Sequence, residues 1–338
     1  MAEALKDVGE FRLIRRIHDL LKREGGVPPA DLTVGIGDDA AAYKPKPGHE
    51  VLITSDSFVE GRHYLPRYVR PRDVGRRAMV ANVSDIGAMG GVPRYALISL
   101  GLKDETLLGD VEEIYRGFLE VLNPFGATVI GGNVTGTQND VFIDITLIGE
   151  VKEGKAVRRS TARPGDAILV TGFPGRAAAG LQLLFRSLVP VENPLATAYI
   201  KPCHRAKAGA SVAATGHASS MIDTSDGFLG DLGHICEESG AGAELFKKRF
   251  PVAEDLQYAA ELLKRDPLEF FLGASDDYEL IITCAGDHVS LIRSAVARAC
   301  EGPVSEVGRI TTKAGKVELV MNDGSRKALT LKGWNHFR

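Results

Sequence analysis

Residues 221–228 (MIDTSDGF) place an acidic tetrapeptide, Asp223-Thr224-Ser225-Asp226, between an apolar pair and a glycine. The apolar pair predicts a strand, and the apolar periodicity of residues 228–238 predicts a helix after Gly227. The stretch therefore predicts mixed α/β structure in which carboxylates stand at the end of a strand.

The same arrangement, aspartates beside glycine or small residues at predicted strand ends, recurs four more times. The recurrences are residues 35–40 (GIGDDA), 54–56 (TSD), 82–85 (NVSD) and 275–279 (SDDYE). One such cluster alone is usually a structural turn, but five together indicate a site. Where carboxylates converge, each like-charge pair at about 4 Å costs roughly 4 kcal/mol at an effective dielectric constant of 20, so hard divalent cations such as Mg²⁺ are expected among them. For Asp38, Asp231 and Asp277, the alternative is a solvated aspartate that caps a helix.

Glycine-rich turns can present backbone N–H groups to phosphate, and candidates are residues 131–133 (GGN), residues 172–175 (GFPG) and Gly227. Residues 35–40 also match G-x-G-x-x-A, but they run into residues 43–48 (YKPKPG) instead of a helix, which excludes a Rossmann fingerprint. The chain contains no Walker motif, so a bound nucleotide is expected to be held by metals and backbone groups.

Periodic and alternating apolar residues predict further elements in both halves of the chain. Helices are predicted at 11–21, 108–122, 176–187 and 288–300, and strands at 51–54, 128–130, 141–148, 167–170 and 280–284. Residues 151–155 (VKEGK) separate two series of alternating predicted helices and strands, so we place a domain boundary there. Residues 1–155 and 156–338 are thus expected to be two domains of an α/β (mixed α+β) fold.

The overall composition excludes several classes of protein. The 338 residues carry 41 Lys+Arg and 44 Asp+Glu, a net charge of −3. The chain as a whole therefore has no excess of positive charge that would attract nucleic acid. No apolar run approaches 18 residues, and charges interrupt residues 1–10, so neither a membrane span nor a signal peptide is predicted. The four cysteines, at 203, 236, 284 and 300, lack zinc-ligand spacing and are expected to be reduced, as in a cytoplasmic protein.

In their order along the chain, these motifs resemble those of the thiamine-monophosphate kinase family, within the superfamily of aminoimidazole ribonucleotide synthetase. The resemblance covers nearly the whole chain and runs through residues 9–11 (GEF), 35–40 (GIGDDA), 54–56 (TSD), 61–63 (GRH), 82–90 (NVSDIGAMG), 131–133 (GGN), 171–175 (TGFPG), 222–227 (IDTSDG), 277–280 (DYEL) and 333–337 (GWNHF). Sibling families are less similar. Selenophosphate synthetases carry a reactive Cys or Sec near the N-terminus and the hydrogenase maturation protein ends in Cys, whereas the first cysteine here is Cys203 and the last residue is Arg338.

The resemblance implies ATP-dependent phosphorylation of thiamine phosphate to thiamine diphosphate, in a homodimer whose N-terminal domain binds ATP and Mg²⁺ and whose C-terminal domain completes the substrate site. Implied ligands of several Mg²⁺ ions are Asp39, Thr54, Ser55, Asp56, Asp85, Asn133, Asp223 and Asp226. Implied ATP contacts are Tyr115, Gly132, Asn133, Arg159 and Ser225, and implied thiamine phosphate contacts are His63, Asp276 and Trp334. No general base is expected, because a phosphate monoester with a second pKa near 6 is largely ionised at pH 7.

Two positions depart from the commonest family pattern. Asn133 stands where many members have Asp, and an amide oxygen is a weaker metal ligand. Asp276 stands where many have Glu, which shortens the side chain by one methylene. Other interpretations stay open: core packing for Trp334 and Tyr115, a loop position for His63, and a solvated charge for Arg159. The alternative functions are another ATP-using synthetase of this superfamily and a non-catalytic nucleotide-binding homologue.

Overall fold

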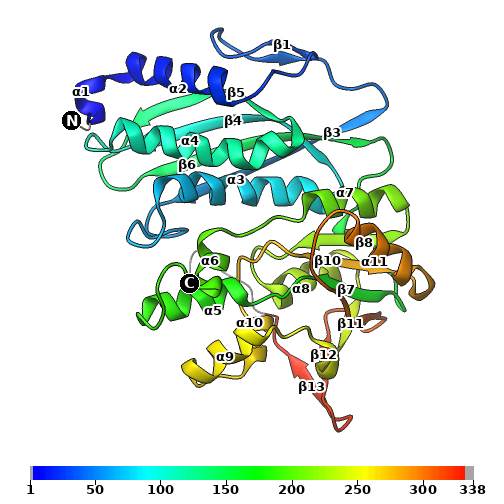
Figure 1. Ribbon diagram of the computed structural model, residues 1–338. Helices are drawn as coiled ribbons and strands as arrows, with labels where there is room; N and C mark the ends of the chain where they lie inside the picture. The colour runs from blue at the N-terminus through cyan, green and yellow to red at the C-terminus, as the bar shows by residue number, and fades with distance from the viewer. Residues whose placement is uncertain (1–2, 332–338) are drawn as a thin grey trace. The chain divides into compact units, whose positions relative to one another are not determined.

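The computed structural model describes residues 3–331, so Trp334 lies outside the described residues. The chain divides into two compact units, residues 1–86 with 91–154, and residues 87–90 with 155–338. Each unit contains one large β-sheet with helices packed on it (Figure 1). The predicted α/β class, with helices and strands mixed in both halves, is therefore confirmed.

The first unit is built on a four-stranded sheet in the order β3-β6-β4-β5. Its strands are β3 (His49–Val59), β4 (Val92–Leu102), β5 (Thr128–Gly136) and β6 (Phe142–Lys152). Strand β6 pairs antiparallel with β3 and β4, whereas β4 and β5 run parallel and are connected through α4 (Leu108–Leu122). A small antiparallel pair, β1 (Leu32–Val34) with β2 (Ala42–Tyr43), precedes the sheet in the chain.

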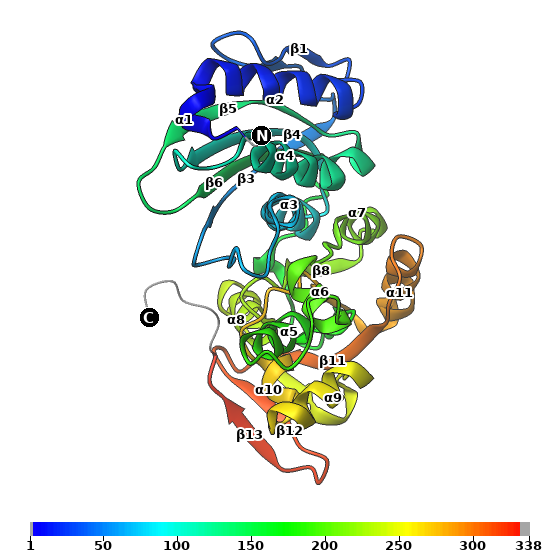
Figure 2. The same ribbon diagram turned by 60° about the vertical axis from the view of Figure 1, so that its left-hand side comes forward.

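The two faces of this sheet differ in burial. In β6, Ile143, Ile145 and Leu147 are fully buried, and α3 (Pro71–Ala88) and α4 lie along that face (Figures 1 and 2). The side chains between them point to the opposite face and are only partly covered: Asp144, Thr146 and Ile148. We call this second face the outer face of the sheet.

Helix α3 differs from the expectation for residues 82–85. The sequence predicts a strand end there, but Asp85 lies on α3, and Asp56 likewise lies within β3 instead of at its end. Most residues of α3 are buried, and a Cβ at its Gly75 would lie 1.9 Å from the Ile114 carbonyl oxygen of α4. A helix buried on most sides lacks the one-sided apolar periodicity that identifies an amphipathic helix, which is why the sequence did not reveal it.

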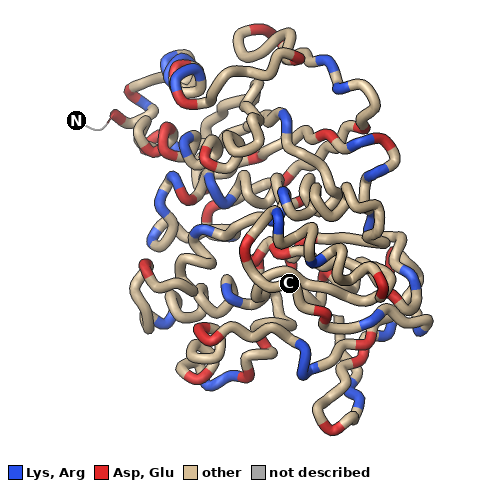
Figure 3. Tube along the Cα trace, turned by 45° about the vertical axis from the view of Figure 1, so that its right-hand side comes forward, with Lys and Arg blue, Asp and Glu red and all other residues tan. Residues whose placement is uncertain are grey.

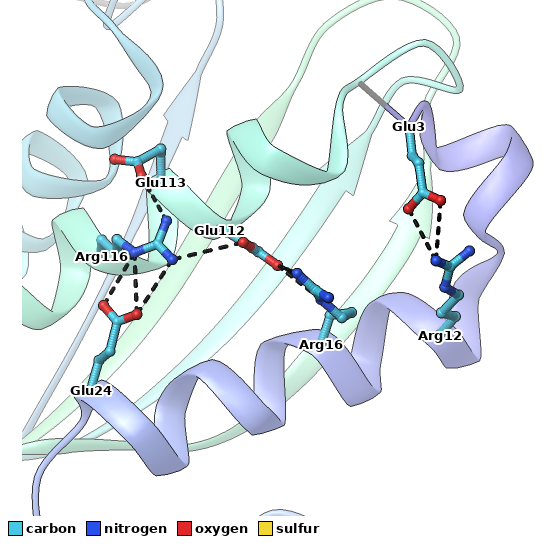
Figure 4. Close-up of polar contacts among 7 residues, drawn as sticks. All are labelled: Glu3, Arg12, Arg16, Glu24, Glu112, Glu113 and Arg116. Carbon is cyan, nitrogen blue, oxygen red and sulfur yellow. Dashed lines mark hydrogen bonds and ion pairs between the residues drawn. The ribbon is translucent and has the colours of Figure 1, made fainter. Parts of the chain in front are cut away.

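Helix α2 (Glu10–Glu24) lies against α4 and follows the short helix α1 (Leu5–Val8). Ion pairs join the two long helices (Figure 4): Arg16 Nη2 lies 2.5 Å from Glu112 Oε1, and Arg116 Nε lies 3.1 Å from Glu24 Oε2. Exposed pairs of this kind contribute only about 0–1 kcal/mol each. Helix α2 is therefore held in place mainly by its buried apolar side chains, Leu13, Ile17, Leu20 and Leu21.

The second unit is built on a seven-stranded sheet in the order β13-β12-β9-β11-β7-β10-β8. Its strands are β7 (Ala167–Thr171), β8 (Ala218–Asp223), β9 (Gly242–Phe246), β10 (Leu280–Cys284), β11 (Val304–Thr311), β12 (Val317–Val320) and β13 (Arg326–Leu329). Neighbouring strands are antiparallel except β12 with β9, which are parallel. The helices are α5 (Arg176–Phe185), α6 (Pro194–Ile200), α7 (Ala206–Thr215), α8 (Phe228–Glu238), α9 (Glu254–Leu263), α10 (Pro267–Leu272) and α11 (Val289–Ala297).

Helices cover both faces of this second sheet. In β7, Ile168 and Val170 belong to an apolar cluster with residues of α8, whereas Ala167 and Leu169 belong to a second cluster with residues of α7 and α11. All five residues of β7, and all five of β10, are buried. Burial on both faces explains why these strands are continuous apolar runs without alternation.

Charged residues of both signs are interspersed along the chain of each unit (Figure 3). Within residues 3–331, no helix is long and apolar enough to cross a membrane. The four cysteines all lie in the described part of the chain, and none of them forms a disulfide.

Candidate active-site residues

In the first unit, Thr54 of β3 contacts Asp85 of α3. The Thr54 hydroxyl donates a hydrogen bond of 2.5 Å to Asp85 Oδ2, and both side chains are half-buried. Asp56 lies two residues further along β3, so its side chain points to the same face as Thr54. This face therefore carries a hydroxyl and two carboxylates, hard oxygen donors of the kind that Mg²⁺ prefers.

Ser55 lies between these residues and points to the outer face. Its Oγ lies 3.2 Å from Thr146 Oγ1 and 3.4 Å from Asp144 Oδ1, both on β6. The metal ligands predicted on β3 are thus divided between the two faces of the strand. Asp144 was not among the residues identified from the sequence.

Gly132 and Asn133 lie on β5, beside β4. Gly132 has φ +151°, and a Cβ at this position would lie 1.8 Å from the carbonyl oxygen of Ile98. Only glycine allows the two backbones to approach this closely. Asn133 follows it, exposed, in register with Ser99 of β4.

Two other predicted residues of the first unit, Asp39 and Tyr115, lie in different environments. Asp39 is exposed, and its backbone N–H donates to Asp38 Oδ1 at 2.9 Å. Tyr115 is buried in α4 and packs edge-on against Phe118, which accords with core packing, and burial raises the pKa of its hydroxyl. An ATP contact of Tyr115 stays a prediction.

His63 lies in the turn that follows β3. Its Nδ1 accepts a hydrogen bond of 2.9 Å from the Val59 N–H, and its ring stacks on Phe58 with centroids 5.3 Å apart. Because Nδ1 is an acceptor, a neutral His63 ring carries its proton on Nε2. The ring is half-buried and held at one edge by the backbone, so its orientation is set.

In the second unit, Thr224 joins two of the predicted acidic segments. Its N–H donates to the Glu279 carbonyl at 2.7 Å, its carbonyl accepts from the Tyr278 N–H at 2.9 Å, and its hydroxyl accepts from the Glu279 N–H at 3.0 Å. Asp223 at the end of β8 and Asp226 in the loop that follows are therefore fixed beside the segment that carries Asp276. Tyr278 adopts φ +55°, a rare conformation for a non-glycine residue, and this bonding holds it there.

Asp231 of α8 is a residue whose role the sequence did not indicate. It is only 2% exposed, so the prediction of a solvated aspartate is wrong. Its Oδ2 accepts from the Asp226 N–H at 3.2 Å, and ligand atoms of Asp226, Asp231 and His234 lie within 4.8 Å of one another. Burial, followed by the nearby Asp223 and Asp226 charges, raises the pKa of Asp231 to about 8. This carboxyl holds the loop residue Asp226, which follows Asp223 at the end of β8.

Asp277 caps the start of α5, as one interpretation of the sequence predicted. Its Oδ2 accepts from the Gly175 N–H at 2.5 Å and its Oδ1 from the Ala177 N–H at 2.9 Å. The carboxylate is half-buried instead of solvated, and burial raises its pKa to about 6. The cap ties the glycine-rich turn 172–175 to the segment 275–279.

The remaining predicted ATP contacts of this unit are exposed. Ser225 lies in the loop between β8 and α8. Arg159 begins the short 3₁₀ helix η2 (Arg159–Thr161), where its carbonyl accepts from Ser239 Oγ at 2.9 Å.

Comparison with known proteins gives matches over nearly the whole length. Residues 37–151 match the family model "AIR synthase related protein, N-terminal domain", and residues 163–320 match its C-terminal domain. The thiamine-monophosphate kinase of Bacillus subtilis (strain 168) is 31% identical over 335 residues, 97% of this chain and 99% of that protein.

Two solved structures resemble the structure of this chain, with sequence identities close to that of the Bacillus subtilis protein. The thiamine-monophosphate kinase of Stenotrophomonas maltophilia K279a is 31% identical with a TM-score of 0.80, over 94% of this chain and 98% of that one. AaThiL complexed with AMPPCP and TMP is 30% identical with a TM-score of 0.76, and each chain is fully covered.

Proposed function

The chain belongs to the thiamine-monophosphate kinases of the AIR synthase related superfamily, and from this premise we propose that it transfers the γ-phosphoryl group of ATP to thiamine phosphate. The products are ADP and thiamine diphosphate. The observation that carries this proposal is the full-length similarity to a structure that holds an ATP analogue and TMP. The hydrogen-bonded acidic segments of both units support it.

The attacking group is a phosphate oxygen of thiamine phosphate, which is already largely ionised at pH 7. The reaction therefore requires no general base, and the main obstacle is repulsion between two polyanions. Bound Mg²⁺ supplies charge neutralisation and alignment for such a transfer. The task of the protein is to hold the metals and both phosphate groups in place.

The donor atoms of the chain fit this requirement. In the first unit we assign Mg²⁺ binding to Asp39, Thr54, Ser55, Asp56, Asp85 and Asn133, all of which offer oxygen donors. In the second unit we assign it to Asp223 and Asp226. Asp231 holds the Asp226 backbone, so it would position these two ligands instead of contacting substrate.

For ATP we assign Tyr115, Gly132, Asn133, Arg159 and Ser225, and for thiamine phosphate His63, Asp276 and Trp334. The absence of a side chain at Gly132 lets β5 lie close against the Ile98 carbonyl of β4, and Asn133 follows directly in the chain. For His63, Nδ1 accepts from the Val59 N–H, which fixes the orientation of the ring.

We further propose that residues 1–155 form the ATP-binding, Mg²⁺-binding and dimerisation domain, and that residues 156–338 contribute Asp276 and Trp334 to substrate binding. The partly covered outer face of the first sheet, where Ile53 is 69% exposed, supports its use in a homodimer. A cytoplasmic location fits the use of ATP and the lack of disulfides. Light scattering tests the dimer: a fully active monomer of 36.2 kDa would contradict it.

The decisive experiment is product analysis. Purified protein with ATP, Mg²⁺ and thiamine phosphate should release ADP and thiamine diphosphate in equal amounts, separated by chromatography. Thiamine without phosphate, in a parallel reaction, tests whether the acceptor must carry a phosphate group. ATP binding without any phosphorylated product would overturn the proposal and favour a non-catalytic homologue.

A further inference from the structure

Two histidines outside the proposed kinase site lie in contact in the second unit. The rings of His217 and His288 have centroids 3.9 Å apart and planes inclined by 38°. His217 lies directly before β8, and His288 ends the 3₁₀ helix η4 (Gly286–His288), immediately before α11. The fold therefore brings together two imidazoles that are far apart in the chain.

The backbone holds both histidines in place. Helices α7 and α11 share an apolar cluster and lie side by side (Figures 1 and 2). The His217 N–H donates to Thr215 Oγ1 at 3.2 Å, and the His288 N–H donates to the Ala285 carbonyl at 3.0 Å. The two rings can rotate about their side-chain bonds, but their proximity is set by the packing of the helices that precede and follow them.

The ring nitrogens are open to a ligand. Within residues 3–331, the His217 ring forms no hydrogen bond, and the one charged partner of the His288 ring is Asp287, whose Oδ1 lies 3.7 Å from Nδ1. His217 is exposed and the His288 side chain is 34% exposed, so solvent reaches both rings. Accessible imidazole nitrogens with uncommitted lone pairs are the commonest metal ligands in proteins.

Asp287 favours one tautomer of His288. Its carboxylate lies beside Nδ1, which favours a proton on Nδ1 and leaves the lone pair on Nε2. Histidines that bind metals usually have a carboxylate, a carbonyl or a water at the other ring nitrogen. In the described part of the chain no lysine or arginine pairs with Asp287, so its negative charge also favours a cation nearby.

The spacing of the two rings suits a single ion. Zinc–nitrogen bonds are about 2.05 Å long, so two nitrogens at a tetrahedral angle lie about 3.3 Å apart. Rings with centroids 3.9 Å apart can reach this spacing by rotation alone, because the Cβ–Cγ torsion of histidine has a broad range. Imidazole suits Zn²⁺, Cu²⁺ and Ni²⁺, whereas Mg²⁺ prefers oxygen, so the histidine pair differs in chemistry from the proposed Mg²⁺ ligands.

We propose that His217 and His288 form a binding site for a divalent ion of the Zn²⁺ or Cu²⁺ type, with Asp287 as a positioning residue. Nε2 of His288 and one nitrogen of His217 are the protein ligands, and water completes the coordination. The ion links the start of β8 to the start of α11 and stabilises the second unit, because it binds the folded chain. The simpler interpretation, two rings in contact without a metal, predicts no binding that depends on both histidines.

The test uses the full-length protein in excess Mg²⁺, which occupies the carboxylate sites proposed above. Calorimetry measures the dissociation constant of Zn²⁺, and electron paramagnetic resonance of Cu²⁺, added at one ion per chain, counts the ligating nitrogens. The variants are His217→Gln, His288→Gln and Asp287→Asn. His18→Gln is the matched control, because it removes a partly exposed histidine of α2 in the first unit. Circular dichroism verifies that every variant folds.

Wild type should bind one Cu²⁺ through two nitrogens, and Zn²⁺ should raise its Tm. Each glutamine variant should retain one nitrogen at most and bind Zn²⁺ at least about 10-fold more weakly, since even a change beside a metal ligand costs that much. Asp287→Asn should keep both nitrogens but weaken Zn²⁺ binding by about 10-fold. His18→Gln should match wild type in every measurement.

Two outcomes would overturn the inference. One is a wild-type spectrum with fewer than two ligating nitrogens, and the other is an unchanged Zn²⁺ dissociation constant in His217→Gln and His288→Gln. The site does not depend on the kinase activity, so all three variants should retain wild-type turnover. A protein that makes no thiamine diphosphate but binds Cu²⁺ through both histidines refutes the proposed function alone.

Discussion

Arg205 and Glu279 face each other in the second unit through two parallel hydrogen bonds, Nε to Oε2 and Nη2 to Oε1, each 2.6 Å long. Glu279 is 6% exposed, and its Oε2 also accepts from the Thr171 hydroxyl at 2.5 Å. The pair therefore joins the end of β7, the start of β10 and the residue before α7. A Cβ at Gly172 would lie 2.0 Å from Glu279 Oε1, so the turn after β7 must carry glycine to admit this carboxylate.

Removal of Arg205 should strongly destabilise the second unit. Arg205→Ala leaves a buried carboxylate without its cation, and breaking a buried pair in this way costs about 3–5 kcal/mol. Lys313→Ala is the matched control, because it removes an exposed pair with Glu318 and should cost about 0–1 kcal/mol. Urea unfolding measures both. A loss below about 1 kcal/mol for Arg205→Ala would show that the pair contributes no more than a surface pair.

Asp277 should make stability depend on pH below neutrality. An aspartate in the unfolded chain has a pKa near 3.9, whereas burial raises that of Asp277 to about 6. Between about pH 4 and pH 6 the folded chain therefore keeps a proton that the unfolded chain has lost, and stability falls as pH rises. Asp277→Asn has no such proton. As pH rises from about 4 to about 6, the free energy of unfolding of the variant should therefore increase relative to that of wild type, and above this range the difference should stay constant.

Urea unfolding at a series of pH values measures this difference. Asp266→Asn is the control for an altered cap, because exposed Asp266 accepts from the Leu268 N–H at the start of α10 and stays in water. The difference in the free energy of unfolding between Asp266→Asn and wild type should vary less with pH. A constant difference between Asp277→Asn and wild type from pH 4 to pH 7 would contradict the raised pKa.

Gly132→Ala should destabilise the first unit. The added methyl group would meet the Ile98 carbonyl at 1.8 Å, and φ +151° is strained for any residue with a Cβ. Each effect costs about 1–3 kcal/mol, so we expect a loss of more than about 2 kcal/mol in thermal or urea unfolding. Gly109→Ala in α4 meets no atom within 4 Å and should instead stabilise by about 0.5–1 kcal/mol. Equal effects of the two substitutions would argue against the close approach of β4 and β5.

The sequence predicted the elements whose apolar residues recur at helical spacing or form a short continuous run. The periodic residues 108–122 coincide with α4, and residues 11–21 lie within α2, because the apolar residues of both helices recur at helical spacing. The strand predicted at 280–284 also coincides with β10, where a short apolar run is bounded by polar residues. Turn residues and apolar periodicity suffice for such elements.

The sequence could not indicate burial that depends on distant neighbours. Asp231 resembles a solvated helix residue in the sequence but is only 2% exposed, and Arg205 pairs with Glu279 at a separation of 74 residues. Asp144 occupies a polar position of an alternating strand, which indicates solvent when read alone. Its place beside Ser55 follows only from the pairing of β3 with β6.

Trp334→Ala should weaken binding of thiamine phosphate specifically. An aromatic ring over a cationic heterocycle contributes about 0.5–2 kcal/mol, and this contact is remote from the transferred group. Steady-state kinetics should therefore show KM for thiamine phosphate raised roughly 2- to 30-fold, with kcat and KM for ATP little changed. An unchanged KM for thiamine phosphate would contradict substrate binding by Trp334 and favour the interpretation that it packs in the core.

Asp85→Asn and Asp56→Asn should abolish turnover without destabilising the fold in the absence of Mg²⁺. Each substitution removes one carboxylate that we assign to Mg²⁺ and keeps a side chain of nearly the same size and shape. Asparagine at 85 can still accept the Thr54 hydrogen bond. Calorimetry should therefore give a Tm equal to or above wild type without Mg²⁺, but a smaller rise in Tm when Mg²⁺ is added, because a weaker binder stabilises less. Asp19→Asn, on the exposed side of α2, should leave turnover and the Mg²⁺-dependent rise unchanged. A large fall in Tm without Mg²⁺ would mean that these aspartates hold the fold together instead of the metal.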